Sequence, residues 1–208
     1  LQELSAVIGS APALGHAQAA ALAKLERAWA TADEDSLTEE YSRLFIGNDA
    51  IVPHETAYGN TGRSAELADI GGFYLAFGFD LREDQHEVPD YLSVELEFYS
   101  LLLLKQAYAL EQSWPDKFDI ARDAAKAFLA DHLGCWTGAV RARAAERQAA
   151  PAYGTLFETI ADLVQHECQT LMVQPAPLIC GSPDFMQAAS FVCPMEQASV
   201  ETRAVASA

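Results

Sequence analysis

The chain of 208 residues lacks the features that define several large classes of protein. Its four cysteines are widely spaced, without a Cys-x-x-Cys pair, and do not make a disulfide scaffold. The longest aliphatic run, Leu101–Leu104, is far shorter than the roughly 20 apolar residues that cross a bilayer. The N-terminal stretch has no basic region ahead of an apolar segment, so it does not look like a secretory signal. We therefore expect a protein of the reducing cytoplasm, without stable membrane insertion.

Basic residues are scarce, because 13 lysines and arginines stand against 30 acidic residues, for a net charge of −17. This balance argues against nucleic acid as a partner, since phosphate binding depends on clustered Lys and Arg. The acidity is uneven. Between Asp33 and Glu97 there are sixteen acidic and three basic residues, whereas Lys105–Arg147 has six acidic and seven basic. This distribution predicts an acidic half that either steers a basic partner or only keeps the protein in solution.

Catalytic motifs are also missing. The chain contains no Gly-x-Ser-x-Gly, no phosphate-binding Gly-x-x-x-x-Gly-Lys and no His-Glu-x-x-His. His166-Glu167-Cys168 with Cys180 and Cys193 could suggest a metal site, but the spacing lacks the tight first pair of structural zinc sites. We therefore predict no enzymatic activity, no metal and no cofactor, and rank a helical metal-dependent enzyme last among the functional classes.

Helical periodicity dominates what is present. Apolar residues recur every three or four positions, as in helices that bury one face. This pattern runs through Leu22–Trp29, Leu37–Phe45, Leu67–Phe77, Phe118–Leu129 and Tyr153–Val164. The segment Tyr91–Leu104 has few polar residues, so its helix is expected to be central. No alternating strand pattern occurs. The prediction is all-α: a single-domain bundle of roughly six to eight helices over residues 1–174, then an irregular, Pro-containing tail over 175–208.

Serine and proline mark several of the expected helix starts. Ser36 and Ser64 are suitable N-caps, and each has a glutamate in the turn that follows. Pro89, Pro115 and Pro151 suit the first turn of a helix, where the missing N–H costs nothing.

Three motifs lie in or beside the two longest predicted loops, Gly47–Arg63 and Phe79–Val88. They read Tyr41-Ser-Arg-Leu44-Phe45-Ile-Gly47, Pro53-His-Glu55-Thr56-Ala-Tyr58 and Glu87-Val-Pro-Asp90-Tyr91-Leu-Ser-Val-Glu95-Leu-Glu97-Phe98. In this order they resemble the Tyr-x-x-Leu-Phe motif, the Pro-x-Glu-Ser-x-Tyr loop and the Glu-Pro-x-Asp-His signature of the TorD/DmsD/NarJ family of redox-enzyme maturation chaperones. Aromatic residues with the family's later spacing follow at Phe128, His132-Leu133, Trp136 and Tyr153.

The resemblance implies a helical chaperone for the catalytic subunit of a molybdenum enzyme, with the type II branch of the dimethyl sulfoxide reductase family as the nearer relation. Such a chaperone binds the basic N-terminal leader of its client, often a twin-arginine signal, and assists cofactor insertion, assembly or export proofreading. It would be cytoplasmic, and a monomer or a homodimer. The alternative is an acidic accessory subunit that stays in the mature oxidoreductase complex.

A leader that is basic at one end and apolar further on needs carboxylates beside an apolar groove. The motifs and the acidic half together predict contacts with the client at Glu55, Tyr58, Tyr74, Glu87, Asp90, Tyr91 and Glu95. Val88 and Tyr91 replace the proline and histidine of the family signature. A role for the carboxylate of Asp90 can therefore be carried over, whereas a role for an imidazole cannot.

Each candidate has a purely structural alternative. Asp90 could be a favourable charge in the first turn of a helix. His132 and Trp136 share one helical face and are more typical of a core than of a site. A buried carboxylate is costly unless it is paired. We therefore expect Glu95 or Glu97 to be partnered by one of three basic residues, Arg43, Arg63 or Lys105.

Overall fold

The computed structural model describes residues 15–176 and 178, apart from 48, 60–62 and 82–87. The chain forms α2 (His16–Ala30), α3 (Glu34–Phe45), the short 3₁₀ helix η1 (Glu55–Ala57), α4 (Arg63–Phe77), α5 (Leu92–Glu111), α6 (Pro115–Phe128), the π-helical turn η2 (Leu129–Leu133), α7 (Gly134–Glu146) and α8 (Pro151–Thr170). No strand occurs in this part of the chain, which confirms the all-α prediction. None of its helices combines the length and the apolar character needed to cross a membrane.

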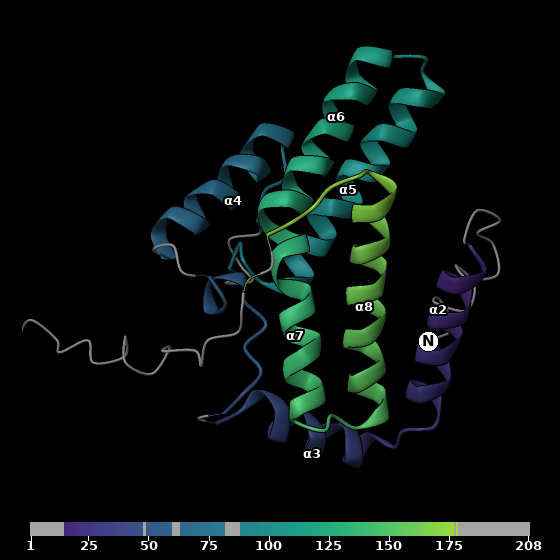
Figure 1. Ribbon diagram of the computed structural model, residues 1–208, viewed down its shortest axis with the longest axis vertical. Coiled ribbons are helices and arrows are strands. Elements are labelled where there is room, and N and C mark those ends of the chain that lie inside the picture. The colour runs from purple at the N-terminus through teal and green to yellow at the C-terminus, as the bar shows by residue number, and fades with distance from the viewer. Residues whose placement is uncertain (1–14, 48, 60–62, 82–87, 177, 179–208) are drawn as a thin grey trace, which may run out of the picture.

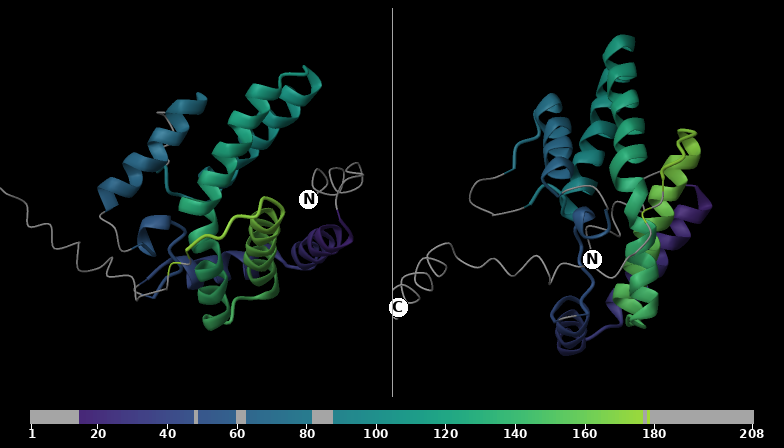
Figure 2. Two further views of the ribbon diagram at one scale, coloured as in Figure 1. Left: turned by 45° about the horizontal axis from the view of Figure 1, so that its top comes forward. Right: turned by 60° about the vertical axis from the view of Figure 1, so that its left-hand side comes forward.

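Two antiparallel helix pairs organise the bundle. α5 packs against α6, and α7 packs against α8, while α2 lies along the other side of α8 (Figure 1). α6, η2 and α7 follow one another without a break, so they join the two pairs. α4 lies beside the α5–α6 pair, on the side away from α2, and the turn between α5 and α6 extends beyond the ends of α7 and α8 (Figures 1 and 2). The predicted tail over 175–208 lies almost wholly outside the described residues and stays a prediction.

The core is centred on aromatic side chains from α4, α5 and α6. Phe98 is fully buried, and its ring centroid lies 4.7 Å from that of Tyr74 and 4.8 Å from that of Phe128. Aromatic pairs at such distances add to the free energy of burial. The prediction that the helix over Tyr91–Leu104 is central holds only for its first part, because Leu103 and Leu104 are 39% and 66% exposed.

Two helix starts differ from those expected. Asp33, not Ser36, caps α3: its carboxylate accepts hydrogen bonds from the backbone N–H and the hydroxyl of Ser36, at 2.9 and 2.6 Å. Ser64 lies inside α4. A carboxylate with two donors is a stronger cap than a serine hydroxyl.

Of the three prolines expected in first turns, two lie where they were predicted and one does not. Pro115 and Pro151 begin α6 and α8, as predicted. Pro89 lies in a turn before the N-cap residue of α5, Tyr91, so it does not belong to the first turn of that helix.

We predict that Phe98→Ala lowers the free energy of unfolding by about 3–5 kcal/mol, because it leaves a cavity among packed aromatic rings. Urea denaturation followed by circular dichroism measures this loss. Leu104→Ala on the exposed part of α5 is the matched control, with an expected change within about 0.5 kcal/mol. Similar losses for both variants would contradict the assigned core.

Candidate functional site

The loop that precedes η1 is joined to the start of α5 by backbone hydrogen bonds. His54 and Tyr91 form an isolated antiparallel bridge. The N–H of Glu55 donates to the carbonyl of Asp90 at 3.0 Å, and the N–H of Leu92 donates to the carbonyl of Pro53 at 3.0 Å. The second and third sequence motifs, which are separate in the chain, therefore form one structural unit.

Side chains of this unit converge on Asp90, which is fully buried. Its carboxylate accepts a hydrogen bond from the hydroxyl of Thr56 at 2.6 Å and one from Nδ1 of His54 at 3.1 Å. Burial alone would raise the pKa of Asp90, but the bonds from His54 and Thr56 outweigh it and lower that pKa. Asp90 also precedes the helix, so it is not the simple first-turn charge that the sequence allowed. Its ionised form holds the loop.

A second buried acid, Glu55, connects the loop to the middle of the bundle. Its two carboxylate oxygens lie 3.1 and 3.2 Å from Nδ1 of His132, which the π-helical turn η2 presents. The other ring nitrogen, Nε2, lies 3.4 Å from a carboxylate oxygen of Asp69 on α4. Burial would lower the pKa of His132, but the hydrogen bond and charge of Glu55 outweigh it and raise that pKa. One imidazole thus ties η2 to η1 through Nδ1, and its Nε2 faces α4 without a hydrogen bond.

The third buried acid, Glu95, has the tryptophan of α7 as its partner. Nε1 of Trp136 donates to a carboxylate oxygen of Glu95 at 3.0 Å. Burial and the nearby charge of Glu55 raise the pKa of Glu95 well above its ordinary value, which favours its protonated form. The expectation that Glu95 or Glu97 pairs with Arg43, Arg63 or Lys105 is therefore not met at Glu95, whose hydrogen-bond partner is an indole. A neutral carboxyl does not need a cation, and an indole satisfies one of its oxygens.

Of the three tyrosines predicted as contacts, two are buried and one lies at the surface. Tyr74 donates from its hydroxyl to the carbonyl of Pro89 at 2.7 Å, and Tyr58 packs on Trp136 with ring centroids 5.6 Å apart. Both rings are buried. Tyr91 is 36% exposed and lies against His54, with ring centroids 5.0 Å apart.

The predicted contacts therefore fall into three groups. The side chains enclosed by the protein are Glu55, Tyr58, Tyr74, Asp90 and Glu95. Tyr91 reaches the surface, and Glu87 lies outside the described residues. Burial makes the enclosed group suited to fixing the shape of the site, while direct contact with a client stays a prediction for all seven.

His132, Trp136, His54 and Thr56 were not predicted as site residues, although they hold the three acids. His132 and Trp136 were considered core residues, which they are by burial. Their partners lie 77 and 41 residues earlier in the chain, at Glu55 and Glu95. The sequence contained one signal that could have revealed these partners. The motif segments have more acidic residues than the nearby basic residues could pair with.

The cysteines form no evident centre. Cys135 and Cys168 are buried free thiols, while Cys180 and Cys193 lie outside the described residues. Within the part of the chain that the structure describes, no three His, Cys, Asp or Glu side chains are grouped so that they could hold a metal ion.

Comparison with known proteins gives a family and several relatives. The family model of the nitrate reductase delta subunit matches residues 11–142. The chain is 32% identical over 114 residues to a chlorate reductase assembly chaperone protein of Ideonella dechloratans, covering 55% of this chain and 57% of that one. It is 36% identical over 102 residues to a selenate reductase assembly chaperone protein of Thauera selenatis, covering 47% and 52%.

A perchlorate reductase assembly chaperone protein of Dechloromonas aromatica (strain RCB) is 28% identical over 145 residues, covering 65% of this chain and 63% of the relative. The chain thus matches between about half and two thirds of the length of these relatives. No solved structure matches it at a significant level.

The raised pKa of Glu95 predicts how Glu95→Gln changes stability with pH. The folded protein keeps a proton that the unfolded chain releases above about pH 4.3, so the native protein loses stability as the pH rises. The amide of the variant does not titrate. We therefore expect the difference in the free energy of unfolding, variant minus native chain, to increase from pH 4.5 to pH 7.5. Urea denaturation at the two pH values measures it. Glu97→Gln, an exposed neighbour, should show no such gain; a pH-independent difference for Glu95→Gln would contradict its protonation.

The lowered pKa of Asp90 predicts the opposite dependence. Its ionised form stabilises the fold above the unfolded pKa of about 3.9, and that contribution is lost as the pH falls through the folded pKa. Asp90→Asn should therefore cost on the order of 2 kcal/mol at pH 7, the scale of hydrogen bonds to a charged group. Thermal denaturation at pH 7 and pH 3.5 should show this difference shrinking at the lower pH. An equal cost at both pH values would be incompatible with an ionised Asp90, and the exposed Asp80→Asn serves as control.

Proposed function

Because the chain belongs to the nitrate reductase delta subunit family, we propose that it is an assembly chaperone for the catalytic subunit of a molybdenum-containing reductase. It binds the subunit before assembly or export and assists the insertion of the cofactor, and it is not itself an enzyme. Its place of action is the cytoplasm, where such subunits are made. Three similar proteins that carry the name of reductase assembly chaperones support this proposal.

One observation connects the proposed function with particular residues. The motif segments around Glu55 and Asp90 are joined by backbone hydrogen bonds. Their buried acids Glu55 and Glu95 bind His132 of η2 and Trp136 of α7. A protein needs no such costly set of buried acids for stability alone, since paired buried charges add little net stability. Their more fitting role is to hold one surface in a defined shape.

That surface lies where the motif segments reach solvent. Tyr91 is partly exposed, and burial of its ring, with a smaller effect of Tyr41 on α3, raises its pKa. Tyr41 and Ile46 are also exposed, at 50% and 66%. Exposed apolar side chains on a strongly acidic protein suit a leader that is basic at one end and apolar further on.

In this proposal the seven predicted residues have two kinds of role. Tyr91 contacts the leader directly, and Glu87 adds negative charge to the loop before it. The buried Glu55, Tyr58, Tyr74, Asp90 and Glu95 position the loop and α5. The chaperone acts as a monomer or a homodimer.

The accessory-subunit alternative is not favoured, because the similar proteins are named for assembly. The two hypotheses differ in one simple observable. A chaperone is absent from the purified, active reductase, whereas an accessory subunit copurifies with it in fixed stoichiometry.

We predict that a synthetic peptide with the N-terminal leader of the client binds the native chain, and that Tyr91→Ala weakens this binding at least tenfold. Loss of one aromatic anchor costs about 1.4 kcal/mol or more, which corresponds to that factor. Isothermal titration calorimetry measures the affinity, and Tyr91→Phe should retain it because the ring remains.

Tyr108→Ala is the matched control, since Tyr108 is an exposed tyrosine at the other end of α5. It should bind the leader as the native chain does. If the native chain binds neither the leader nor the apo-subunit, the proposed function is wrong. If Tyr91→Ala and Tyr108→Ala bind equally well, the function can stand but the assigned surface cannot.

A further inference from the structure

The turn between α5 and α6 exposes an unusual amount of apolar surface. Five large apolar side chains there are between 40% and 66% exposed: Leu104, Tyr108, Leu110, Trp114 and Ile120. Scattered apolar residues are ordinary on a protein surface, but a group of them around one hollow marks an interaction site. Four of the five, Leu104, Tyr108, Trp114 and Ile120, line the same hollow, and Leu110 lines another. The cluster lies on the part of the α5–α6 pair that extends beyond α7 and α8 (Figure 1).

This exposure belongs to an ordered turn, not to a frayed helix end. Ser113 has a left-handed backbone, with φ of 58°, and the N–H of Trp114 donates to the carbonyl of Ala109 at 2.9 Å. Pro115 then begins α6. The ring of Trp114 is held between Tyr108, at 5.8 Å between centroids, and Nζ of Lys117, at 3.8 Å from its centroid. Its position is therefore defined before any partner arrives.

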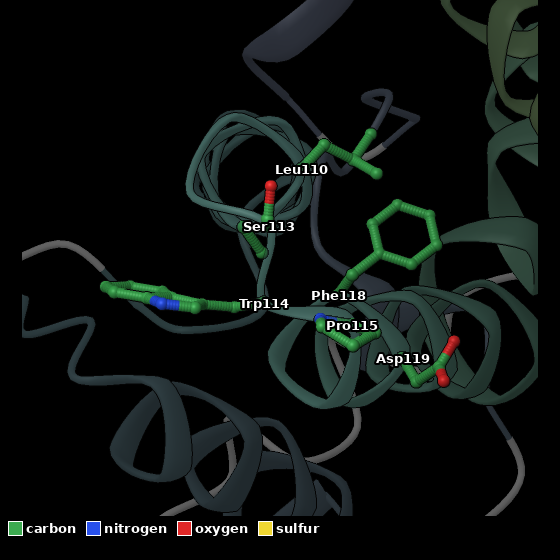
Figure 3. A pocket seen from close by; sticks show the side chains of 7 residues that line it. Leu110, Ser113, Trp114, Pro115, Phe118 and Asp119 are labelled. Atoms are coloured by element: carbon green, nitrogen blue, oxygen red, sulfur yellow. The ribbon is translucent and has the colours of Figure 1, made fainter.

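Trp114 separates two hollows on opposite sides of the turn. The larger, about 470 Å³, lies between the end of α4 at Phe77 and the α5–α6 pair, and Tyr108 and Ile120 also line it. The smaller, about 250 Å³, is lined by Leu110 and Phe118, which point away from Trp114 (Figure 3). We call the larger one the hairpin groove.

The charges around the hairpin groove are basic, in contrast to the acidic protein as a whole. Among the described residues that line it, the charged ones are Lys105 and Lys117. The acidic residues of the next turn, Asp119 and Asp123, lie 2.9 and 3.5 Å from the guanidinium of Arg122. At about 0.15 M salt, screening weakens charge interactions beyond roughly 8 Å, so an occupant of the groove is affected most by the charges that line it. In the described part of the chain these are the two lysines, whereas the exposed Glu111 and Asp116 are not among the lining residues.

From this combination we propose that the hairpin groove is a second docking surface, for an amphipathic helix of a partner protein whose apolar stripe is flanked by Asp or Glu. The apolar floor takes side chains spaced one helical turn apart, as in other helix-in-groove complexes. The lysines pair with the flanking carboxylates and repel a basic leader. The site is separate from the one around Tyr91, so the protein presents two surfaces of opposite charge preference.

The test uses two synthetic helical peptides with the same leucine stripe, one flanked by Glu and the other by Lys. Isothermal titration calorimetry with the full chain should show binding of the Glu-flanked peptide, and at least tenfold weaker binding of the Lys-flanked one. Trp114→Ala should weaken the first interaction at least tenfold. The double variant Lys105→Glu and Lys117→Glu, both at exposed positions, should reverse the preference between the peptides.

Met172→Ser is the matched control, because Met172 is an exposed apolar residue after α8. It should bind both peptides as the native chain does. Equal binding of the two peptides, no binding of either, or full binding by Trp114→Ala with an unchanged circular dichroism spectrum would each overturn the proposal.

Two further measurements distinguish a partner helix in the groove from a second copy of this chain and from the client leader. If sedimentation shows that the native chain self-associates and Trp114→Ala does not, the groove is occupied by a second copy and the proposal is wrong. Binding of the client leader to Trp114→Ala, measured in parallel, should equal that of the native chain. If the native chain does not bind the client leader, that result counts against the proposed function and not against the hairpin groove.

Discussion

A carboxylate inside an apolar bundle is stable only when donors or a proton accompany it, and Glu55 is the point where this requirement shapes the structure. It faces His132 from one side and raises the pKa of Glu95 on the other. His132 also lies 3.4 Å from the carboxylate of Asp69 on α4, through its other ring nitrogen. Glu95 in turn accepts a hydrogen bond from Trp136, which ties α5 to α7.

The local shape of the chain serves this arrangement. The π-helical turn η2 interrupts the regular run from α6 to α7, and it is the segment that carries His132 to Glu55. Such turns insert an extra residue into a helix and are frequent at functional sites. On the other side, the backbone bridge between His54 and Tyr91 brings Asp90 to the donors that keep it ionised. The loop is therefore held by backbone pairing and by side-chain charge together.

The two proposed surfaces follow from the unequal distribution of charge and burial along α5. Its first half is buried among α4, α6 and η2, and its N-terminal end supports the partly exposed ring of Tyr91. Its second half leaves the bundle and exposes Leu104 and Tyr108 beside Lys105. A single helix thus connects a region rich in acids to a groove bordered by lysines.

Local sequence patterns were sufficient for the helical class and for the first turns at Pro115 and Pro151, while the family resemblance pointed to the segments that meet in the candidate site. Periodicity and turn chemistry act over a few residues, so they can be read from the chain itself. The same patterns did not distinguish Asp33 from Ser36 as a cap, since both residue types are favoured there. They also did not show that the apolar face of α5 loses its cover after Leu102.

The pairing of the buried acids was decided by the tertiary structure alone. Glu95 had no basic partner to be found in the sequence, because its partner is an indole 41 residues away and burial raises its pKa. His132 became part of the site only because η2 turns it toward a loop 77 residues earlier. Residue types determine which helices form and which groups must be satisfied. Which groups satisfy one another depends on packing between distant segments, and hydrogen bonds of about 3 Å leave no room for a different arrangement.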